Sequence, residues 1–294
     1  MIPLTSSQKN LKNTSEAFNA QWQNKIEDLL STGKASGADF IEIFLENIDY
    51  ISALAEQDTI TSVSPSFGKG AGIRVFLDGR DGFVSTNDLS DNGLREALEK
   101  ALSMLGLDTC KSQVNEFSGL EVLRDYGRKK EDWLSQVPTL NEASQVLLLG
   151  TKHIEQYGKH INVRRGNYSR SWQEILVAAS DGTFARDVRL HQSLGFNVLS
   201  SDKENLSNVG RRYGSSGSPN EIRNWDSEGS AKDLCDSALK MLYADYVEAG
   251  QMPVVLANKF GGVIFHEACG HLLETTQIER GTSPFSDKLN QSIA

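Results

Sequence analysis

Two histidines and a glutamate lie close together near the end of the chain, in the run HEACGH at residues 266–271. Imidazole nitrogens and carboxylate oxygens are ligands of zinc, and a catalytic zinc site keeps one position for water. In the usual helical peptidase signature the two histidines are four residues apart, and a glutamate directly after the first is the general base. Here His266 and His271 are five residues apart, with Glu267 in the position of the base.

The five-residue spacing decides whether these side chains can meet at one ion. At about 100° per residue, His271 lies about 140° around an ideal α-helix from His266, and imidazoles so far apart do not converge. A local π-type turn would bring residues i and i+5 into register, and Gly270 would ease such a distortion. Glu267 at about 100° and Glu274 at about 80° fall on the same side of the helix. The spacing alone leaves two alternatives open: a metal site, or histidines that only cap the helix or line a core.

The composition limits the class of protein. The chain has 294 residues, of which 23% are charged and 38% hydrophobic, and its formal net charge is −9. This is typical of a globular protein with a sizeable core, in one large domain or two ordinary ones. The sequence shows no basic patch of the kind that nucleic-acid binding needs, so we expect no nucleic-acid partner. No apolar run approaches the roughly 20 residues of a membrane-spanning helix, and the polar N-terminus lacks the apolar region of a secretory signal.

The three cysteines are widely spaced, at positions 110, 235 and 269. An odd number at such spacing is not a disulfide framework, which indicates a reducing compartment, and we expect a cytoplasmic protein. Cys269 lies inside the HEACGH run, but we expect it to be a small buried residue rather than a metal ligand.

The pattern of apolar residues predicts strands in runs that alternate with runs of helices. Helical spacing predicts a helix from Ser15 to Leu30, with Gly33 as its stop, and a helix capped by Ser90. Alternation predicts strands at 39–46 and 50–57, joined by a turn near residues 47–49. Further helices are predicted at 141–157, 226–249 and 260–276, and further strands at 73–77, 82–86, 161–180 (as two strands), 183–200, 206–213 and 252–257. This order indicates an α+β protein with largely antiparallel curved sheets flanked by helices, and with the HEACGH run on a helix near the C-terminus.

Glycines are concentrated at residues 68–72, in the sequence GKGAG. Such a run can bind phosphate when it leads into the N-terminus of a helix. Here the glycines precede a predicted strand and hairpin, so we do not expect a phosphate site.

Longer blocks of sequence carry a family resemblance. Residues 252–257 have the sequence MPVVLA and residues 261–274 the sequence GGVIFHEACGHLLE; shorter blocks are GIRVF at 72–76 and GSSG at 214–217. Together they closely resemble the TldD branch of the TldD/PmbA (TldE) zinc metallopeptidases. The resemblance covers nearly the whole chain after the first dozen residues. The block around His266 is its specific part, because the N-terminal blocks are shared with the non-catalytic branch.

The resemblance implies a zinc-dependent peptidase that hydrolyses short unfolded peptides. It implies that His266 and His271 bind Zn2+, and that Glu267 is the general base acting on a zinc-activated water. It also implies a hetero-oligomer with a PmbA/TldE-like partner subunit that lacks the metal motif. Glu274 would then be placed to orient a histidine ligand.

The chain departs from the family in its length. Family members are typically much longer, and their third zinc ligand is a cysteine in a C-terminal domain, which no residue here matches. The polar character of residues 1–13 predicts a flexible tail. The resemblance predicts a TldD/PmbA-like N-terminal α+β region at 14–250, with a candidate sub-boundary at 108–140, and the start of a truncated metallopeptidase domain at 251–294. The alternative is a catalytically incomplete fragment, or a non-catalytic assembly subunit of a TldD/TldE-type complex.

Overall fold

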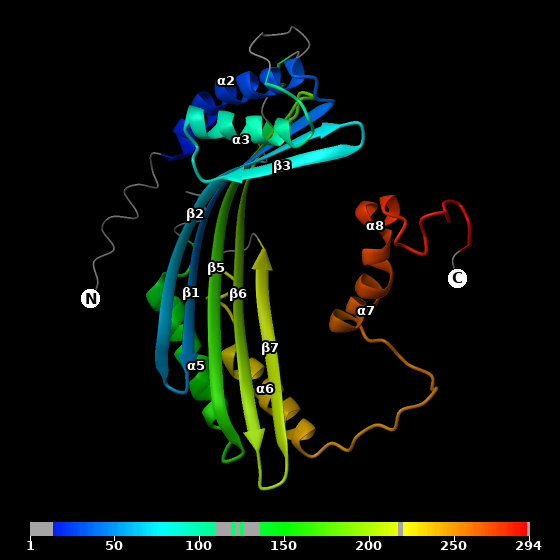
Figure 1. Cartoon of the computed structure of the whole chain (residues 1–294). Coiled ribbons are helices and arrows are strands. Elements are labelled where there is room, and N and C mark those ends of the chain that lie inside the picture. The colour runs from blue at the N-terminus through cyan, green and yellow to red at the C-terminus, as the bar shows by residue number, and fades with distance from the viewer. Residues whose placement is uncertain (1–13, 110–118, 121–123, 126–135, 217–219, 293–294) are drawn as a thin grey trace. The chain divides into compact units, whose positions relative to one another are not determined.

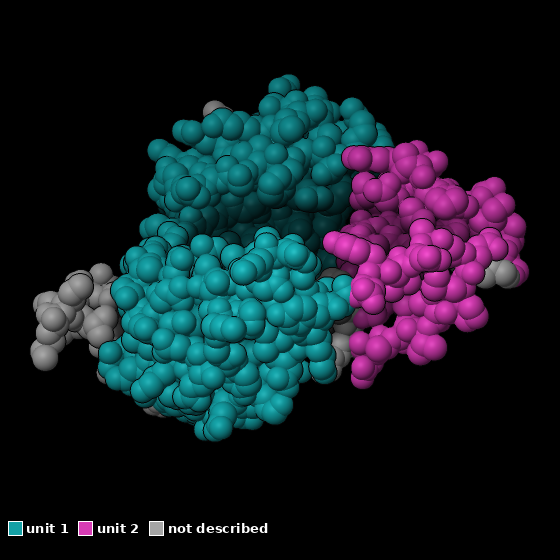
Figure 2. Space-filling model, turned by 90° about the horizontal axis from the view of Figure 1, so that it is seen from below, with its two compact units in different colours: residues 1–244 teal, residues 245–294 magenta. Residues whose placement is uncertain are grey.

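The structure is a computed structural model, and it describes residues 14–109, 119–120, 124–125, 136–216 and 220–292. The chain divides into two compact units, residues 1–244 and 245–294, which Figure 2 colours separately. Unit 1 contains the sheet and its helices, and unit 2 contains the HEACGH run.

Unit 1 is built on one sheet that has seven strands in the described part of the chain, with the order β3-β2-β1-β5-β6-β4 and with β7 also paired to β6. Four strands are long and bend along their length (Figure 1). Every pairing is antiparallel except the short parallel contact between β4 and β6. The strands are β1 (Phe40–Glu56), β2 (Thr59–Leu77), β3 (Arg80–Thr86), β4 (Arg124–Asp125), β5 (Ile161–Ala179), β6 (Phe184–Ser201) and β7 (Leu206–Ser216).

Two pairs of helices cover opposite ends of the sheet (Figure 1). Helices α2 (Thr14–Ala35) and α3 (Asp91–Ser103) pack at one end, and α5 (Leu140–Glu155) and α6 (Ser227–Leu242) at the other. Helices α2 and α3 close the first hydrophobic core over the sheet, and α5 and α6 close the second. The α+β class, with an antiparallel sheet flanked by helices, is therefore confirmed.

The helices of unit 1 follow local capping signals closely. The Ser90 side chain accepts a hydrogen bond from the backbone N–H of Gly93, as predicted for a cap of α3. Helix α5 begins with a full capping box between Thr139 and Glu142, in which each side chain accepts from the backbone of the other. Arg223 also contacts this carboxylate, and these hydrogen bonds lower the pKa of Glu142 to about 2.

The predicted stop of the first helix at Gly33 is wrong. Helix α2 continues to Ala35, and the backbone reverses at Gly37, which has a φ of 95°. Gly33 lies inside the helix, at a point where a Cβ atom would overlap the buried side chain of Ile41 on strand β1. This close approach explains why the residue there is glycine. The glycine allows close helix–sheet contact rather than a turn.

The predicted turn at residues 47–49 is also wrong, because β1 runs through it without a break. Asn47 and Asp49 are typical turn residues, but here their side chains face partners on other strands. Asn47 donates a hydrogen bond to Glu174 at 3.4 Å, and Asp49 lies 3.9 Å from Arg170. The region 161–180 is likewise one strand, β5, rather than two. Ladder pairing on both sides of these segments outweighs the local preference for a turn.

The predicted hairpin at 73–86 is confirmed, with Asp78 and Gly79 both at positive φ in a tight turn between β2 and β3. Residues 68–72 lie within strand β2. Residues 214–216, part of the GSSG block, end strand β7. Most of the candidate sub-boundary at 108–140 lies outside the described residues.

Two predictions near the C-terminus of the chain are corrected. The helix predicted at 226–249 ends earlier, because α6 stops at Leu242. Residues 252–257, predicted as a strand, form no strand or helix and have exposed side chains. Within the described residues, no helix has both the length and the apolar character that crossing a membrane requires.

Helix α5 offers a test of the second core. A Cβ atom at Gly150 would overlap the ring of Phe196, which is itself stacked on Trp225 with 4.9 Å between ring centroids. Alanine normally favours a helix over glycine by about 1 kcal/mol. At this site we expect the opposite: Gly150→Ala should lower the free energy of unfolding by about 1–3 kcal/mol through overpacking. Denaturant titration should show this loss, whereas Gln145→Ala on the exposed face of α5 should be neutral.

Candidate metal centre

The HEACGH run lies in a series of short helical turns of different types. These are η1 (Lys259–Gly262), α7 (Val263–Phe265), η2 (His266–Gly270), η3 (His271–Leu273) and α8 (Thr275–Glu279). The predicted regular helix at 260–276 is therefore wrong in detail. The segment η2 is a π-helical turn, in which the backbone N–H of His271 donates to the carbonyl of His266. The widened turn that the i to i+5 spacing requires is thus confirmed.

Gly270 does not use the conformational freedom of a glycine. Its backbone angles are φ −57° and ψ −54°, which any residue adopts in a helix. A Cβ atom there would lie 3.9 Å from its nearest neighbours, Nδ1 of His266 and the carbonyl oxygen of Phe265. The π turn therefore does not depend on glycine at this position.

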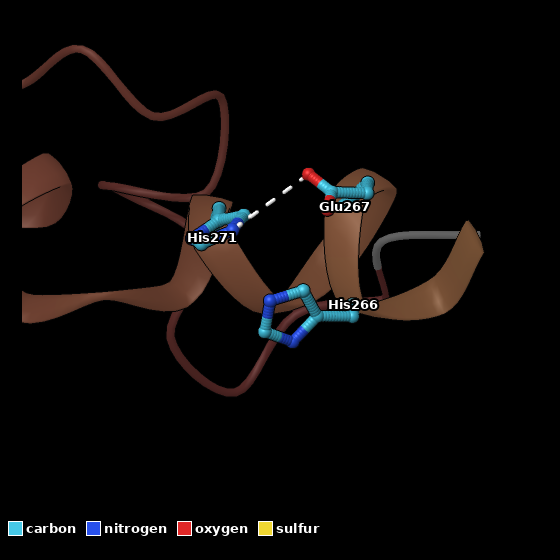
Figure 3. A group of neighbouring side chains, drawn as sticks. All are labelled: His266, Glu267 and His271. Atoms are coloured by element: carbon cyan, nitrogen blue, oxygen red, sulfur yellow. Dashed lines mark ion pairs between the residues drawn. The ribbon is translucent and has the colours of Figure 1, made fainter. Parts of the chain in front are cut away.

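The π turn brings three potential metal ligands together (Figure 3). His266, Glu267 and His271 each offer one ligand atom within 4.8 Å of the others. The two imidazole rings are 4.5 Å apart between centroids and tilted by 71°. The Nε2 atom of His271 lies 3.7 Å from a carboxylate oxygen of Glu267, the pair joined by the dashed line in Figure 3. The residues predicted from spacing are therefore brought together.

The other nitrogen of His271 has its own partner. Its Nδ1 atom lies 2.6 Å from Oε1 of Glu274, which is a short charge-assisted hydrogen bond. A carboxylate only accepts, so Nδ1 carries the proton and donates it. The hydrogen bond that His271 donates to Glu274, and secondarily the charges of Glu274 and Glu267, raise the pKa of His271 above its ordinary value.

The cysteines divide into two environments. Cys269 is exposed within the π turn, so the expectation that it is buried is wrong. Cys235 is buried in the second core, where burial raises the pKa of its thiol to about 12 and keeps it protonated. Cys110 lies outside the described residues.

The donor set suits a transition metal with a preference for nitrogen. Imidazole is a ligand that zinc, copper, iron and nickel bind, whereas magnesium and calcium prefer oxygen alone. Two histidines one widened turn apart, with a carboxylate between them, can supply two ligands and a base. Among the described residues, His266, Glu267 and His271 form a group of this kind.

Three family models match successive parts of the chain. They are described as PmbA/TldA metallopeptidase domain 1, at residues 41–105, the central domain, at 135–242, and the C-terminal domain, at 249–294. The expectation that the C-terminal domain is missing is not confirmed, because its model matches the region that carries the candidate site.

Several proteins that are similar in sequence to this chain are named as metalloproteases. A metalloprotease of Methanocaldococcus jannaschii is 25% identical over 277 residues, which cover 92% of this chain and 58% of the relative. The metalloprotease TldD homolog of Haemophilus influenzae is 25% identical over 266 residues, or 87% of this chain and 54% of the relative. The chain thus spans about half the length of the curated relatives that it matches.

A solved structure shares the fold. TldE from Thermococcus kodakarensis superposes with a TM-score of 0.64 at 17% identity, over 90% of this chain and 58% of that one. At this identity the likeness concerns the fold alone.

The ordinary backbone of Gly270 leads to a prediction. Gly270→Ala should leave the zinc dissociation constant unchanged within about threefold, because the added methyl group makes only ordinary van der Waals contacts. Gly270→Pro should weaken zinc binding far more, because proline clashes with the preceding turn of a helix. Chelator-competition titration measures both. A large loss with alanine would show that the turn does need glycine.

Proposed function

The chain belongs to the PmbA/TldD family of metallopeptidases, and we propose that it is of the TldD branch and hydrolyses short unfolded peptides with a bound zinc. The observation that carries this proposal is the π turn, which brings His266, Glu267 and His271 within reach of one ion. The relatives named as metalloproteases support the reaction class.

We assign the zinc to the two imidazoles. His271 would bind through Nε2, because its Nδ1 is taken by Glu274. When bound there, zinc supplies Lewis acidity that lowers the pKa of water and polarises a scissile carbonyl. The third protein ligand that the family resemblance implies is a cysteine, and among the described residues no cysteine joins the group of His266, Glu267 and His271.

Glu267 is the general base in this proposal. Its side chain is exposed and follows His266 directly, and one carboxylate oxygen lies 3.7 Å from the Nε2 atom of His271. A carboxylate beside the metal-binding nitrogens can accept a proton from the attacking water. It can then donate that proton to the leaving amine of the cleaved peptide.

A partner subunit is part of the proposal. The fold is shared with TldE, and the family resemblance pairs a TldD-like chain with a PmbA/TldE-like one. We propose a hetero-oligomer of this kind in the cytoplasm, where the exposed thiol of Cys269 would remain reduced.

One observation supports a second candidate function. Among the described residues the candidate site supplies two histidines, and two histidines do not complete a zinc shell. A catalytically incomplete or non-catalytic assembly subunit would bind zinc weakly, assemble with the partner and cleave nothing. The two functions differ in whether the chain and partner together hydrolyse peptides.

The role of Glu267 can be tested by a single substitution. Glu267→Gln should lower kcat/KM for a short peptide by about 100-fold or more, because a general base contributes a factor of this size. Zinc content should be unchanged, since both histidines remain. Glu279→Gln removes the same charge from an exposed position in α8 and should have no effect. Hydrolysis that persists in Glu267→Gln would remove this residue from the mechanism.

The partner is tested by co-expression with a tagged PmbA/TldE-like chain. We expect this chain to co-purify at a fixed ratio and peptide hydrolysis to rise when both are present. His271→Ala should abolish hydrolysis and still co-purify, because the ligand is not needed for assembly. Peptide hydrolysis by the chain alone at the full rate would contradict the need for a partner.

A further inference from the structure

We propose that Glu274 is a positioning residue, which fixes His271 so that Nε2 is the nitrogen that faces the metal. This inference rests on the proposed zinc site and adds a residue to it. The contact that carries it is the 2.6 Å hydrogen bond between Nδ1 of His271 and Oε1 of Glu274.

His271 is held between two carboxylates, one at each nitrogen. Glu274 accepts from Nδ1 at 2.6 Å, whereas Glu267 lies 3.7 Å from Nε2, beyond hydrogen-bond distance. The strong contact is therefore on Nδ1, the nitrogen opposite the one that lies 3.7 Å from Glu267. With the proton on Nδ1, the lone pair of the neutral ring is on Nε2, the nitrogen that lies 3.7 Å from Glu267.

The backbone of Glu274 already has a separate structural task. Its carbonyl accepts from the N–H groups of Gln277 at 3.0 Å and Ile278 at 3.1 Å, which makes it the N-cap of α8. Serine, threonine, aspartate or asparagine would be the preferred cap, because their side chains bond to the first free N–H groups. The glutamate side chain makes no such cap bond and reaches back to His271 instead. The residue type at 274 thus fits histidine orientation better than helix capping.

The turn that carries Glu274 is braced by the residues after α8. Ser283, which is 6% exposed, donates through Oγ to the carbonyl of Leu272 at 2.5 Å. The backbone N–H groups of Thr282 and Ser283 both donate to the carbonyl of Gln277. These bonds fold residues 282–283 back onto the turn and hold residues 271–274 in place, so the carboxylate meets His271 in a defined geometry.

The experiment compares Glu274→Ala and Glu274→Gln with Glu279→Ala and Glu279→Gln in the full chain. Zinc affinity is measured by competition with a chelator. Glu274→Ala should weaken zinc binding by about 10- to 100-fold, as loss of a partner of a ligating histidine does. Glu274→Gln keeps an oxygen that can accept from Nδ1, so it should recover at least part of that loss. Both Glu279 variants should match the unmodified chain.

A second readout is the tautomer of His271, followed by nitrogen NMR of the ring. The unmodified chain should carry the proton on Nδ1 with and without zinc, and Glu274→Ala should lose this preference. If Glu274→Ala binds zinc as Glu279→Ala does and keeps the same tautomer, the proposal is wrong. If the unmodified chain binds no zinc at all, the proposed function fails instead, and the tautomer in zinc-free protein still decides whether Glu274 sets the orientation of His271.

Discussion

The pairing of β1 is the constraint on which the architecture of unit 1 depends. This strand is bonded to β2 from Phe40 to Glu56 and to β5 from Glu42 to Glu56. Because side chains alternate along a strand, a slip of one residue would turn every side chain to the other face. The register places Ile41, Ile43 and Leu45 in the first core and Ala53 and Ala55 in the second. The odd-numbered side chains of β1 thus serve both helix layers, and neither core can shift without the other.

Unit 2 is organised by a much shorter-range constraint. The hydrogen bond from the N–H of His271 to the carbonyl of His266 closes one π turn, and it involves only sequence neighbours. That single bond converts an angular separation of about 140° on an ideal helix into two rings with centroids 4.5 Å apart. The convergence of the candidate ligands is therefore a local property of residues 266–271. It does not require the long-range pairing that builds the sheet.

This difference in range explains what the sequence could predict. The cap at Ser90 and the hairpin between residues 73–77 and 82–86 depend on nearby residues, and both were predicted. The π turn is equally local, and it is the distortion that convergence of the two histidines requires. The turn expected at 47–49 and the helix stop expected at Gly33 failed because distant residues decide both. Glu174 and Arg170 on β5 keep Asn47 and Asp49 inside a strand, and Ile41 on β1 requires a glycine in α2. The strand expected at 252–257 has suitable residues, but it is unpaired in the described part of the chain.

The charges around the π turn bear on which ion it can hold. With both imidazoles neutral, residues 266–274 carry the two negative charges of Glu267 and Glu274, and no lysine or arginine lies among them. A divalent ion bound by His266 and His271 would therefore be balanced by carboxylates that are not its ligands in the proposed mechanism. The histidines and the glutamates have different roles in this proposal because their chemistry differs. Nitrogen donors select for a metal such as zinc. The carboxylate of Glu267 remains free to carry a proton, and the carboxylate of Glu274 holds the ring of His271. The extra residue between the two histidines makes this arrangement compatible with a helical backbone, because the π turn places both rings and Glu267 on one side of the chain.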